Sequence, residues 1–178
     1  MKIQRRIFDR VLVLEPACRT DLRGRTAFFA PGELQAVVPG LTVREQRVYT
    51  MPEANTFFGI HYQDRPYPQA KIISVVHGSG LDYVVDLRKE SPTYRRWERL
   101  TLRAGEPLAV YIPAGFGHAF LSLEKDTVQL FAADAPFGNA GSIHYRDPEI
   151  GLELPCGDPI LSEMDRQAPF LRDLDLSW

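Results

Sequence analysis

Short apolar runs separated by turn residues make up most of this chain. After Thr42, eight segments carry the alternating, β-branched and aromatic side chains that are typical of strands. They are residues 43–50, 57–63, 70–77, 81–87, 97–102, 108–112, 118–123 and 128–133. Glycine- and proline-rich turns such as 78–80 and 113–115 separate them. Many short strands with tight turns predict an all-β jelly roll or a related β-barrel.

The two ends of the chain have other patterns. Residues 10–16 alternate as a strand that ends at Pro16, and residues 21–25 form a turn. Residues 31–38 can make one short helix, which Pro39 and Gly40 end. Residues 161–178 are polar with scattered apolar anchors, which predicts a short helix and tail over the sheet. With no repeat or linker, we expect one domain over residues 1–178 with short peripheral helices.

Composition excludes some classes of protein. The net charge of −2 gives no electrostatic reason to expect nucleic-acid binding. No segment has the length and apolarity of a membrane span or a signal peptide, so we expect no membrane contact. Cys18 and Cys156 lie far apart in no metal-binding spacing. They predict a reduced, cytoplasmic protein, although a single disulfide stays open.

His61 poses the main chemical question, because it interrupts the aromatic strand Phe57–Gln63. The run Y-I-P-A-G-F-G-H-A-F places His118 where many cupin barrels supply a metal ligand, and His61 can meet it inside a barrel. A metal site needs further ligands, however, and Gln63 stands two residues after His61. His77 and His144 lie in a turn and a loop, so we expect no metal.

Without a metal, His61 is either a core histidine or a general base. A base needs a nearby cation to stabilise the charge that develops. Lys71 follows the loop 63–68, and a hairpin through that loop would bring Lys71 close to His61. An isolated strand-end lysine is also compatible with an exposed position, so the residues alone leave both alternatives open.

Several motifs, in the same order, resemble the dTDP-4-dehydrorhamnose 3,5-epimerases, which are metal-free cupin-type enzymes. The family pattern R-G-x-H-[YF]-Q is similar to F-G-I-H-Y-Q, Q-x-K-L-V to Q-A-K-I-I, and D-V-A-V-D-[LI]-R to D-Y-V-V-D-L-R. Further on, S-P-T-Y-R-R-W, Y-I-P-A-G-F-G-H-A-F and P-I-L-S-E-M-D also resemble family motifs. The likeness spans nearly the whole chain.

The resemblance implies a site without a cofactor. The histidine that removes the proton next to the C4 ketone of the sugar corresponds to His61, and the aspartate that orients it to Asp165. Lys71 takes the place of the lysine that stabilises the enolate. The resemblance also implies a nucleotide-sugar substrate, dTDP-linked by family default, and a homodimer whose N-terminal strand pairs across subunits.

It further implies a set of substrate-binding residues. His118 corresponds to a residue that helps to bind the diphosphate, and Arg23 to an arginine that contacts the substrate. Gln46 and Gln63 fall at positions that line the pocket. Phe131 falls at the position of a tyrosine that acts as the acid opposite the histidine, and it keeps the ring without the proton donor.

Other departures change charge. Phe58 replaces the usual arginine of R-G-x-H, and Phe28 replaces an acidic residue. Val48 and Tyr49 replace a polar N-x-x motif. These changes favour a substrate other than the rhamnose precursor.

Three functions therefore stay open. The first is an epimerase with altered scope, acting at one carbon or on an unusual sugar, with the proton delivered by water, Tyr49 or Tyr145. The second is a keto-sugar isomerase, and the third is a non-catalytic cupin that binds sugar nucleotides. Retention of His61, Lys71 and Asp165 favours an enzyme that still removes a proton.

Overall fold

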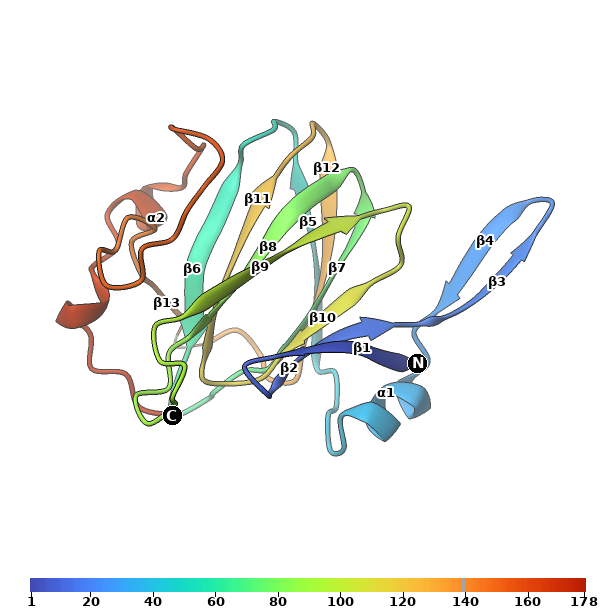
Figure 1. Ribbon diagram of the computed structural model, residues 1–178, viewed down its shortest axis with the longest axis horizontal. Coiled ribbons are helices and arrows are strands. Elements are labelled where there is room, and N and C mark those ends of the chain that lie inside the picture. The colour runs from blue at the N-terminus through green and yellow to red at the C-terminus, as the bar shows by residue number, and fades with distance from the viewer. Residues whose placement is uncertain (139) are drawn as a thin grey trace.

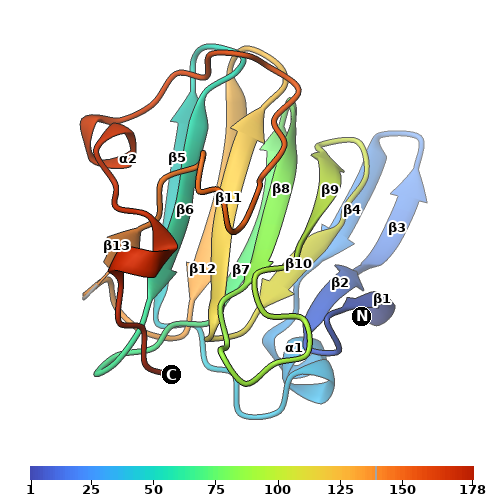
Figure 2. The same cartoon turned by 60° about the vertical axis from the view of Figure 1, so that its left-hand side comes forward.

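The computed structural model describes residues 1–138 and 140–178 and consists mainly of two antiparallel sheets (Figures 1 and 2). The six-stranded sheet has the order β1 (Lys2–Ile7), β2 (Val11–Glu15), β10 (Ala109–Ile112), β7 (Lys71–His77), β12 (Thr127–Ala133) and β5 (Glu45–Met51). The five-stranded sheet has the order β13 (Ala140–Ser142), β6 (Phe57–Gln63), β11 (Phe116–Ser122), β8 (Ser79–Asp86) and β9 (Trp97–Arg103). The predicted all-β, cupin-type jelly roll is confirmed.

The main core lies between the two sheets. Ile73 and Phe131 of the six-stranded sheet pack in one cluster with Val84 and Phe120 of the five-stranded sheet. The period of two along each strand produces this arrangement, because it turns alternate residues toward the facing sheet. The space between the sheets is therefore apolar over most of its length.

Short peripheral elements cover the outer faces, as expected. The helix α1 (Pro31–Val37) packs beside the six-stranded sheet. The C-terminal segment, with α2 (Glu163–Arg166) and the 3-10 turn η1 (Leu171–Asp173), lies over the five-stranded sheet (Figure 2). No helix in the described part of the chain is long and apolar enough to cross a membrane.

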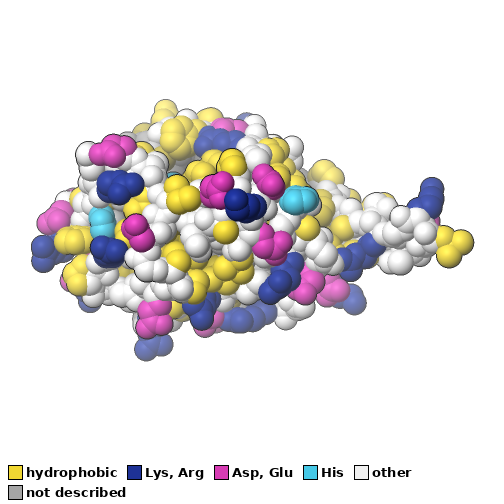
Figure 3. All heavy atoms as spheres, turned by 90° about the horizontal axis from the view of Figure 1, so that it is seen from above, with side chains coloured by type: hydrophobic (Ala, Val, Ile, Leu, Met, Phe, Trp, Pro, Cys, Tyr) yellow, Lys and Arg dark blue, Asp and Glu magenta, His cyan; other side chains and the backbone are white. Residues whose placement is uncertain are grey.

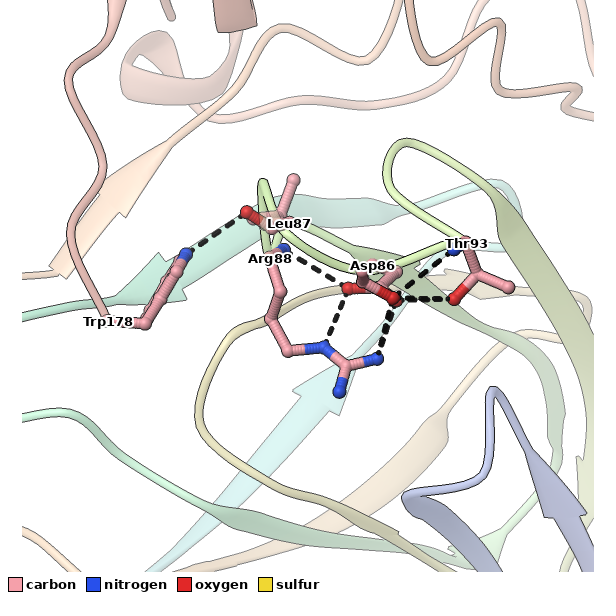
Figure 4. Close-up of polar contacts among 6 residues, drawn as sticks. Asp86, Leu87, Arg88, Thr93 and Trp178 are labelled. Carbon is pink, nitrogen blue, oxygen red and sulfur yellow. Dashed lines mark hydrogen bonds and ion pairs between the residues drawn. The ribbon is translucent and has the colours of Figure 1, made fainter.

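A buried carboxylate anchors the loop after β8 (Figure 4). Asp86 accepts hydrogen bonds from Arg88, Ser91 and Thr93. Burial raises the pKa of Asp86, but these bonds outweigh it and hold that pKa below its ordinary value. Trp178 Nε1 donates to the Leu87 carbonyl at 3.1 Å and so ties the C-terminus to the same loop. The motifs D-Y-V-V-D-L-R and S-P-T-Y-R-R-W, which contain Asp86 and its three partners, therefore have a structural role here.

A two-stranded hairpin projects from the body of the molecule. The hairpin of β3 (Ala17–Asp21) and β4 (Gly24–Phe28) extends away from both sheets, and its tip is the predicted turn at 21–25 (Figures 1 and 3). Nearly all of its residues are exposed. Its sequence lacks a buried face, which is why the alternation did not predict these two strands.

The connection between β6 and β7 differs from the simplest one that the sequence allowed. A hairpin of β6 and β7 was one possible way to bring Lys71 close to His61, but the two strands belong to different sheets. The segment between them crosses from one sheet to the other. Lys71 still approaches His61, because the two residues face each other across the gap rather than along one sheet.

Candidate active site

A cavity of about 290 Å³ lies between the two sheets, and we call it the inter-sheet cavity. Six of the residues predicted from the sequence line it: His61, Gln63, Lys71, His118, Phe131 and Asp165. The remaining lining residues are Arg47, Tyr49, Phe58, Tyr62, Gln69, Gln129, Phe137, Ala140, Gly141, Ser162 and Met164. Most of the predicted site therefore converges on one cavity.

An irregularity in β6 directs His61 into the cavity. His61 pairs with His118 of β11, but the register shifts before Phe58 pairs with Phe120. Phe58 and His61 are three residues apart, and this shift lets both line the same cavity. Gly59 permits it: its φ is +130°, and a Cβ there would lie 2.5 Å from the Ala119 Cβ. The glycine of the F-G-I-H-Y-Q motif is thus a packing requirement of the site.

Asp165 orients His61. His61 Nε2 lies 2.7 Å from Asp165 Oδ1, although 104 residues separate the two in sequence. Ser142 Oγ donates to the same oxygen at 2.7 Å, and Ser162 Oγ donates to Asp165 Oδ2 at 2.9 Å. Burial raises the pKa of Asp165, but the bonds from His61 and the two serines outweigh it and lower that pKa. Asp165 is therefore a carboxylate that accepts from Nε2, and the other ring nitrogen of His61, Nδ1, keeps its lone pair.

Lys71 supplies a buried cation opposite His61. Its side chain is almost fully buried, and Nζ donates to the His61 carbonyl at 3.3 Å. Burial lowers the pKa of Lys71 to about 8; the negative charge of Asp82 opposes this shift and the positive charge of Arg47 adds to it. At neutral pH the amine is still protonated, with little surrounding water to screen its charge.

His118 and Gln63 are held by their own partners. His118 Nε2 lies 2.6 Å from Asp82 Oδ1, and both residues are buried. Gln63 donates to the carbonyls of Tyr67 and Pro136 at 2.6 and 3.1 Å. Gln63 thus fixes two loops at one end of the cavity, besides lining it.

The structure does not bring Arg23 and Gln46 to this cavity. Arg23 is exposed at the tip of the β3–β4 hairpin, where it pairs with Asp21. Gln46 lies on the outer side of β5 and lines a second cavity beside α1. The alternation of a strand turns its neighbours, Arg47 and Tyr49, into the inter-sheet cavity instead.

Some polar residues of the site were not predicted. Ser142 and Ser162 hold Asp165, and Ser162 also accepts a hydrogen bond from the Asp165 backbone N–H at the start of α2. Gln129 is buried in the cavity wall, and its Nε2 has no hydrogen-bond partner within the described residues. The P-I-L-S-E-M-D motif contained the signal for Ser162, three residues before Asp165. No comparable signal marked Gln129.

Together these groups can remove a proton next to a carbonyl. An imidazole oriented by a carboxylate is a general base, and a buried ammonium stabilises the oxyanion of an enolate. Within residues 1–138 and 140–178, no three His, Cys, Asp or Glu side chains cluster as metal ligands would.

Comparisons with known proteins agree with this chemistry. The family model described as dTDP-4-dehydrorhamnose 3,5-epimerase matches residues 6–173. A dTDP-4-dehydrorhamnose 3,5-epimerase of Streptomyces griseus is 39% identical over 66% of this chain, a match that spans 60% of that protein. A dTDP-4-dehydro-6-deoxyglucose 3-epimerase of Streptomyces bikiniensis is 38% identical over 88% of this chain and 82% of that protein.

Solved structures show the same fold. The dTDP-4-dehydrorhamnose 3,5-epimerase of Bacillus anthracis, with TDP and PPi bound, superposes with a TM-score of 0.92 at 31% identity. That match covers 96% of this chain and 99% of the other. A 3'-monoepimerase from Streptomyces bikiniensis, in complex with dTDP-quinovose, has a TM-score of 0.84 at 35% identity and covers 91% and 84% of the two chains. The relatives and the solved structures thus include both 3,5-epimerases, which are named for two carbons, and 3-epimerases, which are named for one.

Proposed function

Because this chain belongs to the dTDP-4-dehydrorhamnose 3,5-epimerase family, we propose that it epimerises a dTDP-linked 4-keto-6-deoxy sugar next to the C4 ketone. It is an isomerase. The observation that carries the proposal is the His61–Asp165 pair facing a buried, protonated Lys71 across the inter-sheet cavity. This is the arrangement that enolisation of a ketone requires.

Each of the six predicted residues that line the cavity then has a role. His61 removes the proton, Asp165 fixes its ring, and Lys71 stabilises the enolate oxygen. His118 and Gln63 bind the nucleotide sugar, and Phe131 supplies an apolar wall. We further propose that residues 1–178 work as one cupin-type domain without a cofactor.

The products test this proposal. After incubation with dTDP-4-dehydro-6-deoxyglucose, borohydride reduction and hydrolysis should release 6-deoxy sugars inverted at C3, at C5 or at both. The number of inverted centres would distinguish a monoepimerase from a 3,5-epimerase. Recovery of only the sugars that unreacted substrate gives would contradict the proposal.

Phe131 favours one alternative, a protein that binds sugar nucleotides without turning them over. A phenylalanine at the acid position removes a proton donor from the cavity wall. Such a binder would show saturable affinity for dTDP-sugars, with no change of configuration and no hydrogen exchange.

We propose that the chain works as a homodimer. Within the described part of the chain, β3 and β4 pair with each other and with no further strand, and isolated two-stranded hairpins are marginally stable in water. Leu22 at its tip is fully exposed, and Phe29 and Val43 expose apolar surface beside α1. A second copy packed on this side would cover the apolar residues, and the hairpin would carry Arg23 toward the partner's cavity.

Mixing two inactive variants tests this arrangement. We expect the wild type to sediment with twice the mass of the 20.2 kDa chain. Co-expression of Arg23→Ala and His61→Ala chains should restore about a quarter of the wild-type sites, because one site of each mixed dimer has both residues. A monomer in solution, or no gain on mixing when Arg23→Ala alone is inactive, would contradict the proposal.

We also propose a cytoplasmic location. Cys18 and Cys156 are both free thiols in the structure. Free thiols are typical of proteins in reducing compartments.

A further inference from the structure

Epimerisation needs a proton donor on the face of the sugar opposite the base, and Phe131 offers none. Any replacement must line the inter-sheet cavity and lie on the wall that faces His61. His61 belongs to β6 in the five-stranded sheet, so the facing wall is the six-stranded sheet.

Tyr49 meets both conditions. It lines the cavity from β5, which belongs to the six-stranded sheet and pairs with β12, the strand that carries Phe131. The Tyr49 and Phe131 rings are in edge contact, with centroids 5.9 Å apart. The phenol therefore stands one strand away from the position that lacks it.

The other hydroxyl groups near the cavity do not qualify. Tyr62 lines the cavity, but it follows His61 directly on β6, so it belongs to the wall of the base rather than to the facing wall, and its ring packs against Trp178. Tyr145 packs with Phe57 in the cluster on the outer face of the five-stranded sheet and does not line the cavity. Ser162 donates to Asp165.

Two neighbours of Tyr49, Arg47 and Gln129, support this role. Arg47, two residues earlier on the same face of β5, donates from Nη1 to the Tyr49 hydroxyl oxygen at 3.3 Å. Its guanidinium is held by Glu45 and lies over the Phe137 ring, 4.6 Å from the centroid. Gln129 is the cross-strand partner of Tyr49 and is 3% exposed. Its Nε2, which has no hydrogen-bond partner among the described residues, is a donor that a sugar oxygen beside Tyr49 would satisfy.

We propose that Tyr49 delivers the proton to the face opposite His61 and that Arg47 is its positioning residue; this rests on the proposed function. His61 takes the proton from the carbon next to the C4 ketone, and the electron pair of the broken C–H bond forms the enolate. The enolate carbon then takes the Tyr49 hydroxyl proton on its other face, and the C4 carbonyl re-forms. The Tyr49 phenolate, beside the Arg47 cation, regains a proton from solvent, and the His61 imidazolium loses one to solvent.

Tyr49→Phe separates the two half-reactions. In heavy water, His61 can still remove the proton and return a deuteron to the same face. We expect exchange within about tenfold of wild type and inversion lowered by about 10²-fold or more, the range for one general acid. Tyr145→Phe, which removes a hydroxyl outside the cavity, should leave the ratio of inversion to exchange unchanged.

Two further variants show whether the lost hydroxyl is the cause. Tyr49→Phe combined with Phe131→Tyr should regain inversion, because the donor returns to the adjacent strand of the same wall. Arg47→Met alone should lower the ratio of inversion to exchange. Added to Tyr49→Phe, it should not lower the ratio further, since its effect passes through Tyr49.

The results distinguish a failure of the inference about Tyr49 from a failure of the proposed function. A wild-type ratio in Tyr49→Phe would overturn the inference and leave the proposed function intact. Loss of exchange together with inversion in folded Tyr49→Phe would also overturn it, because the donor acts after proton removal. A wild-type protein that shows neither exchange nor inversion would refute the proposed function and the inference with it.

Discussion

Replacing His61 with alanine is expected to abolish exchange of the substrate's C3 or C5 hydrogen with solvent. The imidazole is the general base that the Asp165 network orients toward the cavity. Loss of one general base costs about 10²- to 10⁴-fold in rate. The measurement is the initial rate of deuterium incorporation at the two carbons, followed by proton NMR. The affinity for dTDP should change little, since the proposed role of the ring is at the sugar.

His77→Ala is the matched control, because His77 is exposed outside the inter-sheet cavity and bonds the Asp126 carbonyl. It should exchange at the wild-type rate. Exchange that survived His61→Ala at more than about a tenth of the wild-type rate would refute His61 as the base. In that case the His61–Asp165 pair would be a structural hydrogen bond.

Replacing Lys71 with methionine is expected to remove activity and to stabilise the fold. Lys71 is buried with a pKa lowered from 10.5 to about 8. At pH 7, keeping the ammonium protonated in this buried position costs about 3 kcal/mol of folding free energy. Methionine fills a similar volume without the charge. Loss of one oxyanion-stabilising group should also lower the rate by about 10²- to 10³-fold.

The stability difference between Lys71→Met and wild type is expected to decrease as pH rises. Between pH 8 and 10.5 the unfolded chain binds the Lys71 proton and the folded chain does not, so the Lys71 penalty falls as pH rises. Urea unfolding should therefore show Lys71→Met more stable than wild type by about 2–3 kcal/mol at pH 7, and by less at pH 9.5. Wild-type exchange should decline as pH rises through 8, because neutral Lys71 no longer stabilises the enolate.

Lys89→Met is the control for these measurements. Lys89 is exposed and pairs with Asp175, so its loss should change neither stability nor rate by much. A Lys71→Met protein that is less stable than wild type at pH 7, or that keeps its exchange rate, would contradict the assignment.

Strand periodicity predicted most of the fold from the sequence. The eight segments after Thr42 correspond to β5 to β12, and the helix at 31–38 corresponds to α1. The β3–β4 hairpin was missed because a strand without a buried face carries no alternating pattern. The connection from β6 to β7 could not be assigned, because local sequence does not tell whether a loop returns to the same sheet or crosses to the facing one.

The catalytic residues were predictable in identity but not in arrangement. Family motifs located His61 and Asp165, yet only folding brings them within 2.7 Å of each other. The resemblance implied that Gln46 lines the pocket, whereas the alternation of β5 places Arg47 and Tyr49 in the inter-sheet cavity. A register within a sheet depends on its partners, so the sequence offered Tyr49 as one possible donor, but only the structure places it beside Phe131.

The most direct test of the proposed enolisation is proton NMR of the wild-type protein with dTDP-4-dehydro-6-deoxyglucose in heavy water. We predict that the C3 signal, the C5 signal or both disappear at a rate proportional to enzyme concentration. The signal that is lost would identify the carbon from which His61 removes the proton. Retention of both signals, with the dTDP-sugar demonstrably bound, would contradict the account and identify the chain as a binding protein.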